Sequence, residues 1–228
     1  MDLKLAQESL NFLKNNVAGA MPDYELRYPQ MEMIGACSNV IEGSGILIAE
    51  AGTGTGKTFA YLIPLILSGK KGIVSTRTIN LQEQLFSKDL RFLSTLKEFD
   101  YAIAKGRGNY LCLRRLNAYR TSNEEESGEY TKLVRWASKT ETGDIEDYPS
   151  RSFLWDRVYS DADACKGKNC KFYPQCFYFR ARQRWGRAQI VVANHALVSI
   201  NAMLSEDSKI LPKADVLIID EGHALDNA

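Results

Sequence analysis

The chain has 228 residues and a formal net charge of +1, with 45% hydrophobic and 25% charged residues. This composition is ordinary for a globular protein, and the small net charge excludes binding to nucleic acid through overall charge, so any basic surface must be local. No apolar run approaches the roughly 18 residues of a membrane span, and residues 1–10 lack a signal-peptide core. We therefore expect a cytoplasmic protein, in which clustered cysteines indicate a metal site.

The first part of the chain contains two helical patterns and then an apolar run before a third. Residues 3–17 and 33–41 carry apolar side chains at helical spacing, and Cys37 in the second stretch is expected to be a buried small hydrophobe. The short apolar run 46–49 predicts a strand. The almost entirely apolar run 59–67 predicts a helix packed on a sheet.

The alternation of strands and helices then continues. Residues 72–75 and 101–104 are predicted to be strands. Between them we expect a helix that runs to about Leu93, with Asn80 and Glu83 as a capping pair at its start. This order predicts an α/β fold, a parallel sheet with helices on both faces.

The alternation breaks between residues 105 and 188, before sheet-like sequence resumes at 189–193. This segment begins with a basic run, continues as an acidic polar stretch and ends with arginines interleaved with aromatic residues. We predict a small insert between two strands of a main domain that comprises residues 1–104 and 189–228. The arginines and aromatics suit a solvated helix face or a groove for single-stranded nucleic acid, and composition favours neither.

A phosphate-loop pattern follows the apolar run 46–49. Residues 51–58 match Gly-x-x-x-x-Gly-Lys-Thr, with alanine in the first position. The glycines let successive N–H groups turn inward and cradle a polyphosphate at the start of the next helix. Lys57 is predicted to reach the β- and γ-phosphates and Thr58 to hold Mg²⁺, which a chance glycine-rich turn would not explain. The predicted nucleotide-binding residues are Gly52, Thr53, Gly54, Thr55, Gly56, Lys57 and Thr58.

A second apolar run, 216–219, ends in Asp220 and Glu221. A phosphate loop requires such a partner, because Asp220 can hold Mg²⁺ through its water shell and Glu221 can orient and deprotonate the attacking water. The two acids could instead only favour the start of the following helix. The phosphate loop upstream favours the catalytic interpretation.

Four cysteines fall within the predicted insert: Cys112, Cys165, Cys170 and Cys176. Four thiolates suit zinc or an iron–sulfur cluster. The last three are spaced more widely than in usual zinc modules, and they do not match a ferredoxin run. The spacing favours a metal site over unrelated buried thiols, and it does not choose the metal.

Together, these motifs resemble the DinG/YoaA branch of the XPD-like superfamily 2 iron–sulfur DNA helicases. The resemblance rests on the phosphate loop, on Asp-Glu-Gly-His at 220–223 and on Val-Ala-Asn-His-Ala-Leu at 192–197. Arg-Tyr-Pro-Gln at 27–30 resembles the adenine-reading Q motif of that family, which implies nucleotide contacts by Arg27 and Gln30. Ser-Thr at 75–76 and Leu-Gln-Glu-Gln at 81–84 resemble the motif that touches the DNA backbone.

The resemblance implies a RecA-like fold and an ATP-dependent, 5′→3′ DNA helicase of repair or replication, with ATP and Mg²⁺ as cofactors. His223, after a glycine that replaces the usual alanine, is implied to couple the nucleotide site to the rest of the motor; the implied catalytic set is Lys57, Asp220, Glu221 and His223. Residues 106–112 resemble the segment with the first cluster cysteine, which implies that the four cysteines of the insert hold a 4Fe–4S cluster. Implied partners are single-stranded and forked DNA, with a replication or repair protein as a further candidate.

Family members continue beyond Asp-Glu-Gly-His with an arch insert and a second motor domain, whereas this chain ends at Ala228. We therefore expect either the first motor domain of a longer helicase or a naturally short relative. Alone, it is expected to bind nucleotide weakly and not to unwind DNA. The alternative class is a non-motor nucleotide- and DNA-binding, redox-responsive module, and a second motor domain encoded downstream would argue against it.

Overall fold

A computed structural model describes residues 4–52, 54–150 and 152–227. The chain divides into two compact units, Met1–Ile103 with Arg187–Ala228, and Ala104–Gly186. The interpretation of these units as a main domain and its cluster-bearing insert stays a prediction. Each unit is described by itself.

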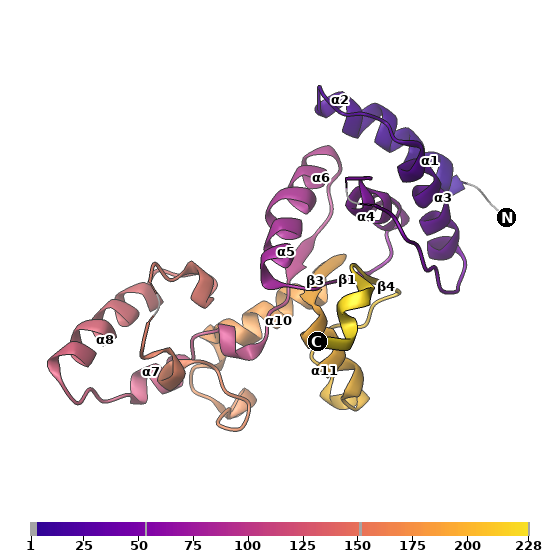
Figure 1. Cartoon of the computed structure of the whole chain (residues 1–228). Helices are drawn as coiled ribbons and strands as arrows, with labels where there is room; N and C mark the ends of the chain where they lie inside the picture. Colours follow the sequence, from indigo (N-terminus) through magenta and orange to yellow (C-terminus); the bar gives the residue numbers. More distant parts are fainter. Residues whose placement is uncertain (1–3, 53, 151, 228) are drawn as a thin grey trace. The chain divides into compact units, whose positions relative to one another are not determined.

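The first unit is built on a four-stranded parallel sheet with the strand order β2-β3-β1-β4 (Figure 1). The strands are β1 (Gly72–Thr76), β2 (Tyr101–Ile103), β3 (Ile190–Asn194) and β4 (Val216–Ile219). β1 lies between β3 and β4, so that Val74 is opposite Val192 on one side and Ile218 on the other. In the sequence, β1 precedes the second unit and β3 follows it, so their pairing joins two segments of the first unit that the second unit separates. The predicted α/β class with a RecA-like parallel sheet is confirmed.

Helices cover both faces of this sheet. The apolar core contains Val74 and Val192 together with the buried side chains of α4, which continues through Pro64. Ser75, on the opposite face by strand alternation, shares a hydrogen bond of 2.6 Å with His195 in α11. The helices of this unit are α1 (Lys4–Phe12), π-helical Leu13–Val17, α2 (Ala18–Ala20), α3 (Tyr28–Glu42), α4 (Lys57–Ser68), α5 (Ile79–Gln84), π-helical Leu85–Leu90, α6 (Arg91–Leu96), α11 (His195–Met203) and the 3-10 turns Glu206–Ser208 and Gly222–Asn227.

Two local expectations for this unit are wrong. Residues 46–49 form no strand: Ile46 is 90% and Ile48 92% exposed, so neither a hydrogen-bonded neighbour nor burial stabilises extended pairing there. The helix after β1 is capped by Thr78 and not by Asn80. The backbone of Thr78 is extended, and its hydroxyl accepts a hydrogen bond from the N–H of Leu81 at 3.2 Å, as an N-cap requires.

The outer edge of the sheet is apolar. β4 is the last strand in the order, and its side chains alternate between half-buried and exposed. Val216 and Ile218 pack against the core, whereas Leu217 is 54% and Ile219 38% exposed. The face of β4 that points away from α4 is therefore an exposed apolar surface.

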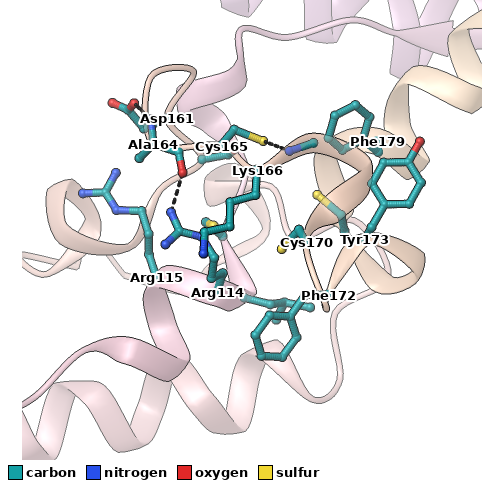
Figure 2. Close-up of a pocket in the computed structure, with 15 residues that line it drawn as sticks. Arg114, Arg115, Asp161, Ala164, Cys165, Lys166, Cys170, Phe172, Tyr173 and Phe179 are labelled. Carbon is teal, nitrogen blue, oxygen red and sulfur yellow. Dashed lines mark hydrogen bonds between the residues drawn. The ribbon is translucent and has the colours of Figure 1, made fainter.

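The second unit is made of short helices connected by loops, as the expectation of a mostly helical insert requires. Its α-helices are α7 (Leu113–Ala118), α8 (Glu124–Ala137), α9 (Trp155–Val158) and α10 (Phe177–Arg187), and its 3-10 turns are Arg107–Asn109, Ile145–Asp147, Gly167–Asn169 and Tyr173–Gln175. Trp136 packs edge-on against Trp155 and Tyr148, and the Trp155 indole N–H donates to Gly108 O at 2.9 Å. Arg114 donates to Ala164 O, which ties α7 to the loop before Cys165 (Figure 2).

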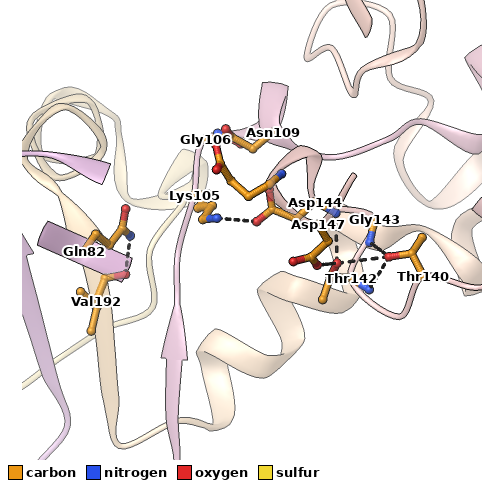
Figure 3. Close-up of polar contacts among 11 residues, drawn as sticks. Gln82, Lys105, Gly106, Asn109, Thr140, Thr142, Gly143, Asp144, Asp147 and Val192 are labelled. Carbon is orange, nitrogen blue, oxygen red and sulfur yellow. Dashed lines mark hydrogen bonds and ion pairs between the residues drawn. The ribbon is translucent and has the colours of Figure 1, made fainter. Parts of the chain in front are cut away.

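A buried ion pair connects Lys105, at the start of the second unit, to Asp144. Lys105 Nζ lies 2.7 Å from Asp144 Oδ2, with side chains 4% and 10% exposed (Figure 3). Asp144 also caps the turn 145–147, because its carboxylate accepts from the N–H of Glu146 at 3.1 Å. Since a buried carboxylate without its partner is costly, the pair makes the second unit sensitive to loss of either charge.

No described helix combines the length and the apolarity that a bilayer crossing requires.

We predict that Lys105→Met lowers the free energy of unfolding of the second unit by about 3 kcal/mol, because Asp144 is left buried and unpaired. The matched control is Lys132→Met, which removes an exposed lysine 3.7 Å from Glu129 and should cost less than about 1 kcal/mol. Urea unfolding followed by tryptophan fluorescence measures both, because the three tryptophans, Trp136, Trp155 and Trp185, all lie in this unit. Equal losses in the two variants would contradict the assignment.

Candidate nucleotide site and cysteine pocket

The phosphate loop is closed by its own hydrogen bonds. Gly54 and Gly56 have φ angles of 76° and 82°, which favour glycine. The Thr55 hydroxyl donates to Gly52 O at 2.9 Å, and Lys57 Nζ donates to Ala51 O at 3.1 Å. The lysine ammonium therefore reaches back to the start of the loop from the first residue of α4. Thr53, also predicted to bind nucleotide, lies outside the described residues.

A buried glutamine hydrogen-bonds to the backbone of this loop. Gln30, in the first turn of α3, is 2% exposed; its Nε2 donates to Gly56 O at 3.0 Å, and its Oε1 accepts from the Tyr24 hydroxyl at 2.7 Å. A Cβ atom at Gly56 would lie 2.2 Å from Gln30 Nε2, so a side chain at this position would have to displace the Gln30 amide, and the positive φ also favours glycine. Both ends of the amide are thus used within the protein.

The second residue expected from the Q motif behaves differently. The Arg27 side chain is 50% exposed and lies 3.9 Å from the Glu25 carboxylate, a long surface ion pair of small energetic weight. Arg27 is therefore accessible to a ligand, whereas Gln30 is engaged. Nucleotide contacts by either residue stay a prediction.

Asp220 is tied both to the sheet and to the helix of the phosphate loop. Its N–H donates to Ser75 O at 2.9 Å, which extends the β1–β4 pairing by one residue. Its Oδ2 accepts from the Tyr61 hydroxyl at 3.1 Å. Burial, with the neighbouring Asp220 carboxylate, raises the pKa of Tyr61 well above its usual value, so the phenol stays protonated and donates. Asp220 and α4 are thereby connected.

Glu221 has a strained backbone. Its φ of 55° is the one positive value recorded for a non-glycine residue in the described ranges. A side chain in this left-handed region costs about 1–2 kcal/mol, and such strain gathers at functional sites. His223 follows in the turn 222–227, where it is exposed. The strain at Glu221 is consistent with a functional role for this acid.

The four cysteines of the second unit line one pocket (Figure 2). They come from four places in the sequence: before α7, on either side of the turn 167–169, and before α10. Burial raises the pKa of Cys176, and the nearby Cys112 and Cys165 add to this, while N–H groups at the start of α10 lower it. The N–H of Gly167 donates to Cys165 Sγ at 3.3 Å. The pocket therefore offers four sulfur donors together with N–H groups directed at sulfur.

The thiols share this pocket without forming a closed ligand set. Within residues 4–52, 54–150 and 152–227, no three His, Cys, Asp or Glu side chains are close enough together to hold a metal ion. The fifth cysteine, Cys37, is buried in α3 of the first unit, and burial raises its pKa to about 11, as expected for a small hydrophobe. The donor chemistry suits a sulfur-ligated metal or cluster, and the ligand roles of the four cysteines stay a prediction.

The hydrogen bonds by which three side chains hold other groups in place were not predicted from the sequence. Tyr24 and Tyr61 hold Gln30 and Asp220, and Asn194 caps α11 by accepting from the N–H of Leu197 at 2.9 Å. A signal for Tyr61 exists in the sequence, because it lies three residues after Thr58 and hence on the same face of the helix. Asn194 has the ordinary signature of an N-cap. Tyr24 carries no such signal.

Two family profiles match the chain. The DEAD/DEAH box helicase profile matches residues 29–116, and the DEAD_2 profile matches residues 75–228. The first match contains the phosphate loop, and the second contains the four cysteines of the pocket together with Asp220 and Glu221.

Curated relatives agree with these profiles. The chain is 38% identical to the ATP-dependent DNA helicase YoaA of Escherichia coli (strain K12), over 92% of this chain and 35% of the relative. It is 38% identical to YoaA of Haemophilus influenzae, over 93% of this chain and 34% of the relative. It is 35% identical to the ATP-dependent helicase DinG of Mycobacterium tuberculosis, over 87% of this chain and 34% of the relative. The chain thus spans about a third of the length of these relatives.

We predict that Glu221→Gly raises the free energy of unfolding by about 1 kcal/mol, because glycine adopts a positive φ without strain. The control is Glu98→Gly, at an exposed loop position without positive φ, which should lower it by about 0.5–1 kcal/mol through added chain entropy. Urea unfolding followed by far-ultraviolet circular dichroism measures both. If Glu221→Gly loses as much stability as the control, the backbone of Glu221 is not strained.

Proposed function

The chain belongs to the DEAD_2 family, and on this premise we propose that it is the ATP-binding and ATP-hydrolysing front motor domain of an ATP-dependent DNA helicase. The observation that carries this proposal is the connection of two motifs by Tyr61: the helix that follows the phosphate loop holds the carboxylate of Asp220. This contact supports a single site formed by the phosphate-binding and acidic elements, as nucleotide hydrolysis requires.

In this proposal, each polar group of the site has one task. The loop N–H groups and Lys57 bind the phosphates of ATP, and Thr58 with Asp220 holds Mg²⁺. Bound Mg²⁺ supplies positive charge that neutralises the phosphate oxygens. Glu221 orients the attacking water and accepts its proton, and His223, exposed beside it, couples the site to the rest of the motor.

The substrate is single-stranded or forked DNA, on which the complete helicase moves 5′→3′ in repair or replication in the cytoplasm, with a replication or repair protein as a candidate partner. The relatives named as ATP-dependent DNA helicases support the DNA substrate. The basic and aromatic residues of the second unit supply the charge and ring faces that single strands bind.

The second unit is proposed to hold a 4Fe–4S cluster through Cys112, Cys165, Cys170 and Cys176. Support comes from the shared pocket and from the N–H groups directed at Cys165 and Cys176, because hydrogen bonds to sulfur stabilise thiolate ligands. A bound cluster would supply sulfur–iron bonds that join four separate chain segments. It would therefore stabilise the fold of this unit.

The nucleotide site is tested by the affinity for ATP and for GTP in Mg²⁺. Lys57→Ala should weaken both by at least about tenfold, because a charged phosphate contact is lost. If Gln30 supports the loop, Gln30→Ala should weaken ATP and GTP by the same factor, and Tyr24→Phe should do so in the same direction to a smaller extent. Loss of ATP affinity alone in Gln30→Ala would instead indicate adenine reading. Unchanged affinity in Lys57→Ala would overturn the proposed site.

The cluster is tested by iron, sulfide and zinc content after anaerobic purification. We expect iron and sulfide in the wild-type chain and their loss in Cys165→Ser, because one of four thiolate ligands is removed. Cys37→Ala, which removes the buried thiol of the first unit, is the matched control and should keep full content. Zinc without iron, or equal content in the two variants, would contradict the assignment.

A further inference from the structure

Tyr61 contacts one of the two side chains that are proposed to hold Mg²⁺ and shares a helix face with the other. Thr58 and Tyr61 are three positions apart in α4 and so face the same side of the helix. The Tyr61 hydroxyl donates to Asp220 Oδ2 at 3.1 Å. One oxygen thus connects the helix of the phosphate loop to the end of β4.

We propose that Tyr61 is a positioning residue for the divalent cation of the nucleotide site, holding the Asp220 carboxylate in the orientation that Mg²⁺ requires. This inference rests on the proposed function, because it concerns the cation that accompanies the nucleotide. It adds a residue that neither binds the ion nor touches the phosphates.

The direction of the hydrogen bond suits this role. A phenol has one proton, and Tyr61 gives it to the Asp220 carboxylate. The bond is to Oδ2, so the second carboxylate oxygen of Asp220 is not used by Tyr61. The contact therefore orients the carboxylate and leaves an acceptor oxygen for the ion.

The surroundings keep the phenol in place. Tyr61 is 4% exposed and belongs to the apolar core, together with Leu62, Leu65 and Val74. A ring packed in this way has little rotational freedom, so the position of its hydroxyl is set by the fold. The backbone of Asp220 is already fixed by its N–H bond to Ser75 O. Tyr61 supplies the remaining constraint, on the carboxylate itself.

The test uses Tyr61→Phe, which keeps the ring and removes the hydroxyl. The affinity for ATP is measured by calorimetry twice, once with Mg²⁺ and once with EDTA, and the ratio is the gain in affinity due to Mg²⁺. We expect Tyr61→Phe to reduce this gain by about tenfold, because a hydrogen bond to a charged group is lost, and to leave the affinity in EDTA unchanged.

The matched control is Tyr148→Phe in the second unit. There too a buried tyrosine hydroxyl donates to a carboxylate, that of Glu129, at 3.1 Å. This variant should lose a similar amount of thermal stability and keep the full Mg²⁺ gain. In an Asp220→Asn background, where the charged acceptor is absent, Tyr61→Phe should have little further effect on the gain.

The outcomes separate the inference from the function on which it rests. If wild type binds ATP, Lys57→Ala does not, and Tyr61→Phe keeps the full Mg²⁺ gain, the positioning role is wrong and the nucleotide site stands. The positioning role is also wrong if Tyr61→Phe weakens binding equally with and without Mg²⁺, since that indicates only a structural contribution. If wild type does not bind ATP, or if Lys57→Ala binds ATP as tightly as wild type, the proposed function itself fails.

Discussion

The parallel pairing of β1 with β4 is the contact on which the proposed nucleotide site depends. It places the carboxyl ends of the two strands side by side, and the bond from Asp220 N–H to Ser75 O continues the ladder past the last paired residues. Because α4 packs on the same sheet through Val74, the acid at the end of β4 comes within reach of a side chain on α4. A shift of one residue in this pairing would turn Asp220 to the other face of the sheet.

The phosphate loop is held in a comparable way, by contacts from outside the motif. Gln30 in α3 donates to Gly56 O, and Tyr24 in turn holds the Gln30 amide. The loop therefore depends on α3 and on the segment before it, although none of its own residues lies there. Backbone strain is a further feature of the proposed site, because it lies at Glu221 itself, the acid that is proposed to act on water.

Local patterns in the sequence predicted most of the fold, and long-range contacts account for what they missed. The strands β1 to β4 and the helices α3 and α4 follow from apolar periodicity, and the loop glycines at 54 and 56 follow from their motif. The strand expected at 46–49 depended on a neighbour that a local pattern cannot supply, and the N-cap at Thr78 depended on which of several polar residues is extended. The contact of Tyr61 with Asp220 joins residues 159 positions apart, so only the folded chain reveals it. The ligand roles of the cysteines stay a prediction, because a shared pocket is a weaker condition than a closed ligand set.

The exposed face and open edge of β4 also have a consequence for the chain in solution. An edge strand presents unpaired N–H and C=O groups, and here it also carries Leu217 and Ile219 on its exposed face. Native proteins usually protect such edges with lysine, proline, a bulge or a covering element, since an apolar edge templates the addition of strands from other molecules. Between Val216 and Ile219 the sequence has only aliphatic residues. We therefore expect concentrated samples of this chain to associate through this edge, and dilution or a charged residue on this strand to reduce the association.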